Sequence, residues 1–102
     1  MRDIKNYQML INGDWVDASD GGVFESINPS TQTVWSRVPK ATEEDVNRAV
    51  SAAHYAFSEG PWSKLTPTER GKCLRKLGDL LADHSENLGR IDTLDTGKML
   101  KE

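Results

Sequence analysis

The sequence of 102 residues predicts an α+β fold in which short β-hairpins are followed by three amphipathic helices. Two observations predict it. Up to Pro39, short apolar runs are separated by Gly, Pro, Asn and Asp, which is typical of strands and turns. Beyond Pro39, apolar residues recur at intervals of three and four, the period of a helix. We therefore expect strands over about 8–39 and helices over about 43–58, 67–83 and 85–96.

The first hairpin is predicted by Asn12-Gly13, which separates the apolar runs 9–11 and 15–16. Both residues tolerate positive φ, which a type I′ turn needs at its two central positions. Asp20-Gly21-Gly22 predicts a second turn. The segments "VFESI", "NPSTQ" and "TVWSRVP" then predict a strand, a turn and a strand.

The first helix is predicted to begin after Thr42, a good N-cap, and to stop at Gly60-Pro61. Three acidic residues at 43–45 suit the positive end of its dipole. Its apolar positions fall on one face: Val46, Ala49, Val50, Ala53 and Phe57.

The second helix is predicted by the capping box "TPTE", with Thr66 as cap and Glu69 reaching back. Its apolar face carries Leu74, Leu77 and Leu81. The segment "DHSE" resembles another capping box, which starts a third helix or continues the second.

Gly97-Lys98 does not belong to a phosphate-binding loop, because that motif needs a Gly where Asp92 stands and Ser or Thr where Met99 stands. Gly97 is instead predicted to be the C′ glycine that ends the third helix. The short strands offer little sheet for three helices to cover, so the pattern indicates part of a larger assembly.

The composition excludes several kinds of partner. Thirteen basic and 16 acidic residues give a net charge of -3, which predicts no nucleic-acid or anionic-membrane binding. The charged start "MRDIKNYQML" is not expected to act as a signal peptide, and the sequence has no run of about 20 apolar residues that could span a membrane. A single cysteine cannot form an internal disulfide, so we expect a reducing, cytoplasmic setting.

Few residues are candidates for chemistry. Cys73 would need a base such as His54 or His84 to act as a nucleophile, and we interpret it as a buried, inert side chain. The two histidines have no cluster of metal-ligand spacing around them. Asp95 falls in the middle of the apolar stripe of the third helix, where a carboxylate needs a partner or a cation unless the stripe ends before it.

The order and spacing of five segments resemble the N-terminal part of the NAD(P)-dependent aldehyde dehydrogenases. The segments are "INGDWVDA", "NPST", "ATEEDVNRAVSAAHYAF", "PWSKLTPTERG" and "TLDTGK". The departures from the family pattern are Gln32 in place of Gly, Asp92 in place of Glu, and Met99 in place of Pro.

The resemblance implies that residues 1–102 are a partial cofactor-binding domain, the opening part of a Rossmann-like α/β fold. It implies that the complete enzyme uses NAD or NADP and an aldehyde substrate. It also implies that the nucleophilic cysteine, the general-base glutamate and the dinucleotide-binding segment lie outside this chain. No catalytic or cofactor-binding residue is therefore expected here. The family's monovalent-cation site maps onto the carbonyls of Ser26 and Ile27 and the carboxylate of Asp95.

Two functional hypotheses follow. In the first, the chain is an N-terminal fragment of an aldehyde-oxidising enzyme and is inactive alone. In the second, it is a free-standing interaction or dimerisation module without catalytic activity. The partner is accordingly the remainder of the aldehyde dehydrogenase fold or a second copy of the chain.

Overall fold

A computed structural model describes residues 3–99, and within them short strands precede three α-helices, as the sequence predicts. The strands are β1 (Lys5–Asn6), β2 (Met9–Ile11), β3 (Asp14–Val16), β4 (Val23–Asn28) and β5 (Thr33–Pro39). The helices are α1 (Glu43–Ser58), the 3-10 turn η1 (Pro61–Lys64), α2 (Pro67–Asp83) and α3 (Ser85–Thr96).

The predicted hairpin at Asn12-Gly13 is confirmed. β2 and β3 pair antiparallel, with Leu10 opposite Trp15. The two turn residues have φ values of 52° and 81°, the positive values that a type I′ turn requires. The hairpin therefore forms because Asn and Gly accept this conformation at low cost.

A three-stranded sheet has the order β1-β5-β4. β1 was not predicted: it pairs parallel with β5 and sets Lys5 opposite Ser36. β4 and β5 pair antiparallel, but their register shifts between Ser26 and Ile27. Ser26 faces Ser36 and Ile27 faces Val34, so Trp35 has no partner on β4 and forms a β-bulge.

Helix α1 begins with a complete capping box. The Thr42 hydroxyl accepts from the Asp45 amide, and the Asp45 carboxylate accepts from the Thr42 amide at 2.9 Å. The same carboxylate also accepts from the Ser19 amide at 3.0 Å, although Ser19 lies 26 residues earlier. Asp45 therefore joins the loop after the hairpin to the start of α1.

Helix α2 begins with the predicted capping box of Thr66 and Glu69. The second predicted box, "DHSE", is wrong as a cap: His84 occupies the N-cap of α3 and no side chain caps that helix. The backbone turns at His84, with φ -104° and ψ 14°, so α3 is a separate helix. His84 donates its amide to the Leu80 carbonyl and its own carbonyl accepts from Leu88, so the helices meet without a side-chain cap.

Gly97 ends α3 in the left-handed conformation, with φ 75°, as predicted. A Cβ atom at this position would lie 2.9 Å from Cγ of Pro29, in the turn between β4 and β5. Glycine is thus favoured both by the left-handed backbone conformation and by the close approach of Pro29. The end of α3 lies directly against the turn between β4 and β5.

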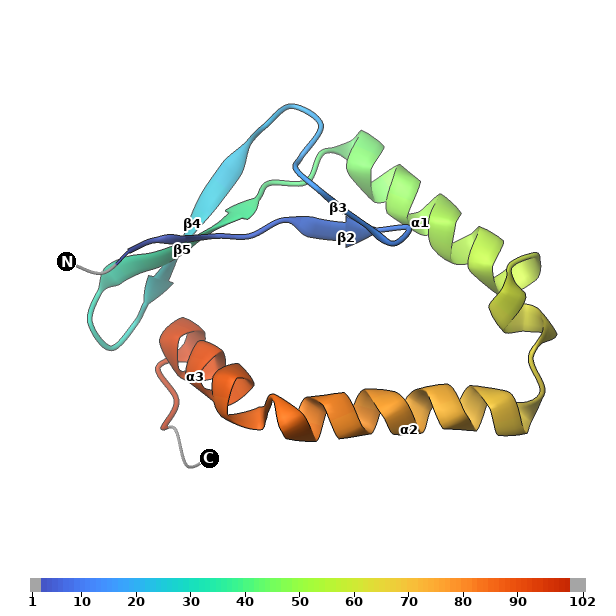
Figure 1. Ribbon diagram of the computed structural model, residues 1–102. Coiled ribbons are helices and arrows are strands. Elements are labelled where there is room, and N and C mark those ends of the chain that lie inside the picture. The colour runs from blue at the N-terminus through green and yellow to red at the C-terminus, as the bar shows by residue number, and fades with distance from the viewer. Residues whose placement is uncertain (1–2, 100–102) are drawn as a thin grey trace.

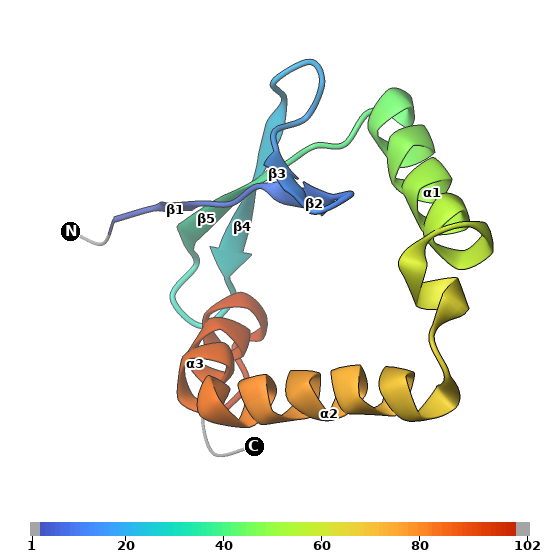
Figure 2. The ribbon, with the colours of Figure 1, turned by 45° about the vertical axis from the view of Figure 1, so that its right-hand side comes forward.

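The elements form an open arch. Figures 1 and 2 show α3 beside one end of the sheet and α1 near the hairpin, while α2 runs between them away from the strands. The radius of gyration is 17.1 Å, whereas a compact domain of this length has about 13 Å. The accessible surface is 8367 Å², roughly 2,600 Å² more than a compact protein of this mass exposes.

Little of the chain is buried. Among the described residues, only Ala18 and Trp35 are buried hydrophobic side chains. The apolar stripes of α1 and α2 are exposed, including Val50, Phe57 and Leu74. The interpretation of Cys73 as buried is wrong, because the thiol is exposed on a face of α2 that the described residues leave uncovered. None of the helices within residues 3–99 has the length and apolarity needed to cross a bilayer.

Candidate cation site

The predicted site residues Ser26 and Asp95 meet where α3 crosses β4. The Ser26 hydroxyl donates a hydrogen bond to Oδ1 of Asp95, although the two residues lie 69 positions apart. Asp95 is exposed, so both sequence interpretations hold in part: the carboxylate reaches solvent and also has a partner. Ile27 is the next residue of β4, and its side chain is exposed.

The two elements are held in this arrangement by features outside the site. Gly97 rests on Pro29 just beyond β4, which fixes the last turn of α3 against the turn between β4 and β5. Ser26 and Phe24 lie two positions apart on β4 and therefore face the same side of the sheet, the side that α3 covers.

These residues fit a monovalent cation. Within the described residues β4 pairs only with β5, so every second carbonyl group along its outer edge has no strand partner, which provides one free carbonyl from the neighbouring residues Ser26 and Ile27. Carbonyl and carboxylate oxygens are ligands that hard cations prefer. The role of Ser26, Ile27 and Asp95 as ligands stays a prediction.

A hollow of about 470 Å³ opens beside the pair, between α3 and the sheet. The residues that line it include Asp92, Asp95, Ser26 and Ser36. None of the described side chains that line it is basic. Ser36 was not predicted to lie here, because a Ser in an alternating strand gives no signal until the pairing register is known.

The β-bulge also directs Trp35 into this lining together with its neighbour Ser36. The Trp35 and Tyr7 rings meet edge to face, with centroids 6.0 Å apart. Nε1 of Trp35 and Oγ of Ser36 are buried and have no hydrogen-bond partner among the described residues.

The other candidate groups are not assembled. Cys73 lies on α2, His54 on α1 and His84 between α2 and α3. Within the part of the chain that the structure describes, no three His, Cys, Asp or Glu side chains lie close enough to hold a metal ion. A candidate cation shell at Asp95 therefore depends on main-chain and hydroxyl oxygens.

Asp45 has a shifted pKa but belongs to no candidate site. The Thr42 amide, followed by the Ser19 amide, lowers the pKa of this carboxyl by hydrogen bonding to its charged form, and burial opposes the shift. The Thr42 hydroxyl and the Arg48 guanidinium lower it further. The lowered pKa is explained by the hydrogen bonds that Asp45 accepts at the N-terminus of α1. The role of Asp45 is therefore to stabilise the start of this helix.

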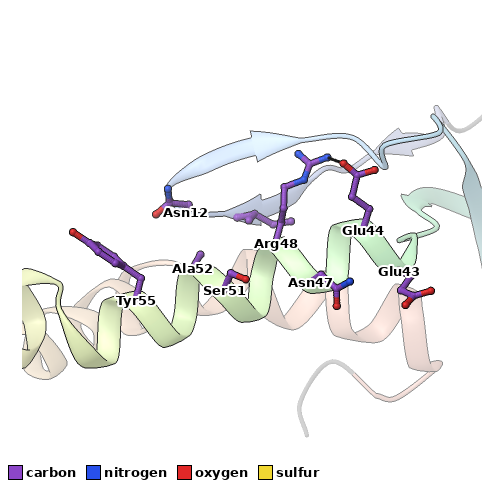
Figure 3. A pocket seen from close by; sticks show the side chains of 9 residues that line it. Asn12, Glu43, Glu44, Asn47, Arg48, Ser51, Ala52 and Tyr55 are labelled. Carbon is purple, nitrogen blue, oxygen red and sulfur yellow. Dashed lines mark hydrogen bonds and ion pairs between the residues drawn. The ribbon is translucent and has the colours of Figure 1, made fainter.

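A second hollow, of about 750 Å³, lies between the hairpin tip and α1. Figure 3 shows Asn12 from the hairpin facing Ala52 and Tyr55 of the helix. Arg48 and Glu44 form an ion pair of 3.0 Å at its edge. Both charged side chains are mostly exposed, so this hollow has no buried polar group that indicates a ligand.

The architecture and sequence match known proteins along nearly the whole chain. The model of the aldehyde dehydrogenase family matches residues 15–102, so the chain belongs to the aldehyde dehydrogenase family.

Two relatives and one solved structure illustrate the match. The chain is 42% identical to (Z)-2-((N-methylformamido)methylene)-5-hydroxybutyrolactone dehydrogenase of Acinetobacter baylyi, over 97% of the chain and 20% of that protein. It is 43% identical to mitochondrial aldehyde dehydrogenase family 2 member B4 of Arabidopsis thaliana, over 93% of the chain and 18% of that protein.

The NAD+ complex of aldehyde dehydrogenase from Bacillus cereus superposes with a TM-score of 0.92 at 42% identity, covering 95% of this chain and 20% of that one. The chain spans about a fifth of the length of the relatives it matches.

Proposed function

We propose that the chain acts as the N-terminal segment of an NAD(P)-dependent aldehyde dehydrogenase, which in complete form oxidises an aldehyde to a carboxylic acid. The observation that supports this most is the match in fold and sequence over 95% of the chain to an NAD+-binding aldehyde dehydrogenase. We also propose a cytoplasmic setting, in which the exposed Cys73 stays reduced.

In this proposal residues 1–102 are a partial cofactor-binding domain and provide a scaffold for the rest of the fold. Their own residues do not fit a dinucleotide, because the eight glycines of the sequence include no pair with the spacing of a glycine-rich phosphate turn. The exposed faces of α1 and α2 supply the surface on which the remainder of the enzyme packs.

The scaffold includes a cation site formed by the carbonyls of Ser26 and Ile27 and the carboxylate of Asp95. A bound monovalent cation would offset the charge of Asp95 and tie α3 to β4. Its contribution is structural: it holds the end of α3 in place and takes no part in the oxidation.

A graft tests the scaffold role. Residues 5–98 replace the matching segment of the Bacillus cereus enzyme, and aldehyde-dependent NADH formation is measured for the graft, the unmodified enzyme and the 102-residue chain alone. We expect activity in the graft and none in the chain alone. A folded graft without activity, or an active isolated chain, contradicts the proposal.

The same graft tests the cation site. Asp95→Ala should lower the melting temperature and remove its dependence on potassium or sodium relative to choline chloride at equal ionic strength. Asp79→Ala, which removes an exposed carboxylate from α2, is the matched control and should keep that dependence. Equal melting temperatures for Asp95→Ala and the unsubstituted graft in all three salts would count against the site.

A further inference from the structure

One arginine interrupts the apolar stripe of α2. Arg70, Leu74, Leu77 and Leu81 stand at i, i+4, i+7 and i+11, so all four lie on one face of the helix. Arg70 is half-buried, whereas every other residue of α2 is exposed, the leucines included. The least exposed side chain of this helix is therefore a charged one that stands where an apolar residue is expected.

The charge of Arg70 has no partner on its own helix. Helical side chains meet those three and four positions away. For Arg70 these positions hold Thr66, Pro67, Cys73 and Leu74, and none of them is acidic. Among residues 3–99 the Arg70 guanidinium also forms no ion pair with another element.

The other basic residues of the α-helices differ in this respect. Arg48 pairs with Glu44 at 3.0 Å on α1, and Arg90 pairs with Glu86 at 2.8 Å on α3. The remaining basic residues of α2 each have an acid three or four positions away: Lys72 has Glu69, and Arg75 and Lys76 have Asp79. Arg70 is the exception, and it is also the one that stands on an apolar stripe.

The stripe of α2 is a surface for the rest of the enzyme. Its leucines are 51–60% exposed, and Figure 2 shows no other described helix or strand along the length of α2. The chain covers 20% of the Bacillus cereus enzyme on which it superposes with a TM-score of 0.92, so most of that fold lies outside the matched segment. A contiguous apolar surface of this kind indicates a packing face. Whatever covers the leucines also removes water from Arg70.

A guanidinium that loses its water needs a negative partner. Removing this charge from water costs free energy unless it is paired and hydrogen-bonded, and the guanidinium stays protonated because its pKa is so high. A carboxylate accepts two parallel N–H bonds from the planar fork and neutralises the charge. A main-chain carbonyl also accepts hydrogen bonds, but it leaves the charge uncompensated.

We propose that Arg70 pairs with an Asp or Glu carboxylate contributed by the part of the enzyme that covers the leucine stripe of α2. This inference rests on the proposed function and names the partner chemistry at one point of the packing surface. The pair also fixes where α2 lies on that surface, because a bidentate ion pair forms in one position, whereas apolar side chains alone discriminate less between positions.

The first test is arginine modification by phenylglyoxal, measured by peptide mass spectrometry in the isolated 102-residue chain and in the graft of residues 5–98. Arg75, which is exposed on the same helix, is the internal control. We expect both arginines to react in the isolated chain. In the graft we expect Arg70 to react at least about tenfold more slowly than Arg75, because its modification then requires local opening.

The possible failures are distinguishable. Equal reactivity of Arg70 and Arg75 in an active graft overturns this inference and leaves the proposed function standing. A folded graft without activity overturns the proposed function instead. Protection of Arg70 in the isolated chain that increases with its concentration would mean that a second copy covers the stripe, and it contradicts the inference.

The second test identifies the partner group. In a crystal structure of the active graft, a carboxylate oxygen should lie within about 4 Å of the Arg70 guanidinium. A main-chain carbonyl or solvent in that place overturns the inference. This result needs no variant, so it stands even if substitutions at Arg70 prevent folding.

Variants of the graft then measure the pair in urea unfolding. Arg70→Met keeps an apolar stem but removes the charge, and it should lower the unfolding midpoint more than the matched control Arg75→Met. Arg70→Lys keeps the charge without the fork and should fall between the two. In a double-mutant cycle, Arg70→Met and the amide variant of the partner acid should lose less together than the sum of their separate losses. Additive losses, or equal midpoints for Arg70→Met and Arg75→Met, contradict the pair.

Discussion

Replacing Gly97 by Ala tests whether the end of α3 is fixed by the conformation of one residue and its contact with Pro29. A non-glycine residue in the left-handed region costs about 1–2 kcal/mol. The smaller entropy of the unfolded Ala variant offsets about 0.4–1 kcal/mol of that cost. The added Cβ would lie 2.9 Å from Cγ of Pro29, and such overpacking costs typically about 1–3 kcal/mol.

The net loss for Gly97→Ala is therefore about 3 kcal/mol, which corresponds to a fall in melting temperature of roughly 12–24 °C for a chain of this size. Thermal unfolding followed by far-ultraviolet circular dichroism measures it. Gly78→Ala is the matched control: its Cβ meets nothing within 4 Å, and it lies inside α2. Alanine should stabilise that helix by about 1 kcal/mol.

Two further variants separate the two causes. Gly97→Asn retains the contact with Pro29 but tolerates the left-handed conformation, so it should lose less stability than Gly97→Ala. In a double-mutant cycle, Pro29→Ala should recover the part of the loss that comes from the contact. If Gly97→Ala melts at or above the temperature of the unsubstituted chain while Gly78→Ala is stabilised, the reasoning is refuted.

Three other predictions concern separate parts of the chain. Gln32 has a φ of 59°, so Gln32→Gly should raise stability by up to about 1 kcal/mol in urea unfolding, and a loss would refute the strain argument. The pKa of Asp45 in the folded chain lies below its ordinary value of 3.8. The ionised carboxylate therefore stabilises the folded state fully above the unfolded-state pKa, and this stabilisation is lost as the pH falls through the lower folded-state pKa. Melting temperatures measured from pH 5 downward should fall less for Asp45→Asn than for the unsubstituted chain, and parallel curves would contradict the assignment. The isolated chain should self-associate or bind a hydrophobic dye, since Phe57 is 79% exposed; sedimentation showing a concentration-independent monomer with no dye signal and a cooperative melt would show that 102 residues form a complete domain.

Features set by neighbouring residues could be predicted from the sequence. Asn12-Gly13 specifies a turn by its own backbone preferences, and Thr66 with Glu69 specifies a helix start within four positions. Gly97 was identified as a helix end for the same reason. Each of these depends on a local conformation, which one short stretch of sequence encodes.

Features that join distant residues could not be predicted in this way. β1 is two residues long and pairs across 31 positions, as Lys5 opposite Ser36 shows. The bond from the Ser19 amide to Asp45 is equally non-local. The family resemblance selected Ser26 and Asp95 for the candidate cation site, whereas the pairing of Ser26 with Ser36 depends on a register that no periodicity in β5 encodes.

The bulge at Trp35 means that the pairing register of β5 would survive one kind of length change. A gene that lost the codon for this residue would keep every existing pair on both sides, with Val34 opposite Ile27 and Ser36 opposite Ser26, and the ladder would simply become regular. Loss of a codon inside β4, at Glu25 for example, would instead turn each side chain beyond it to the opposite face of the sheet. Loss of Trp35 therefore keeps the pairing register but removes one of the two buried hydrophobic side chains, whereas loss of Glu25 changes the register itself.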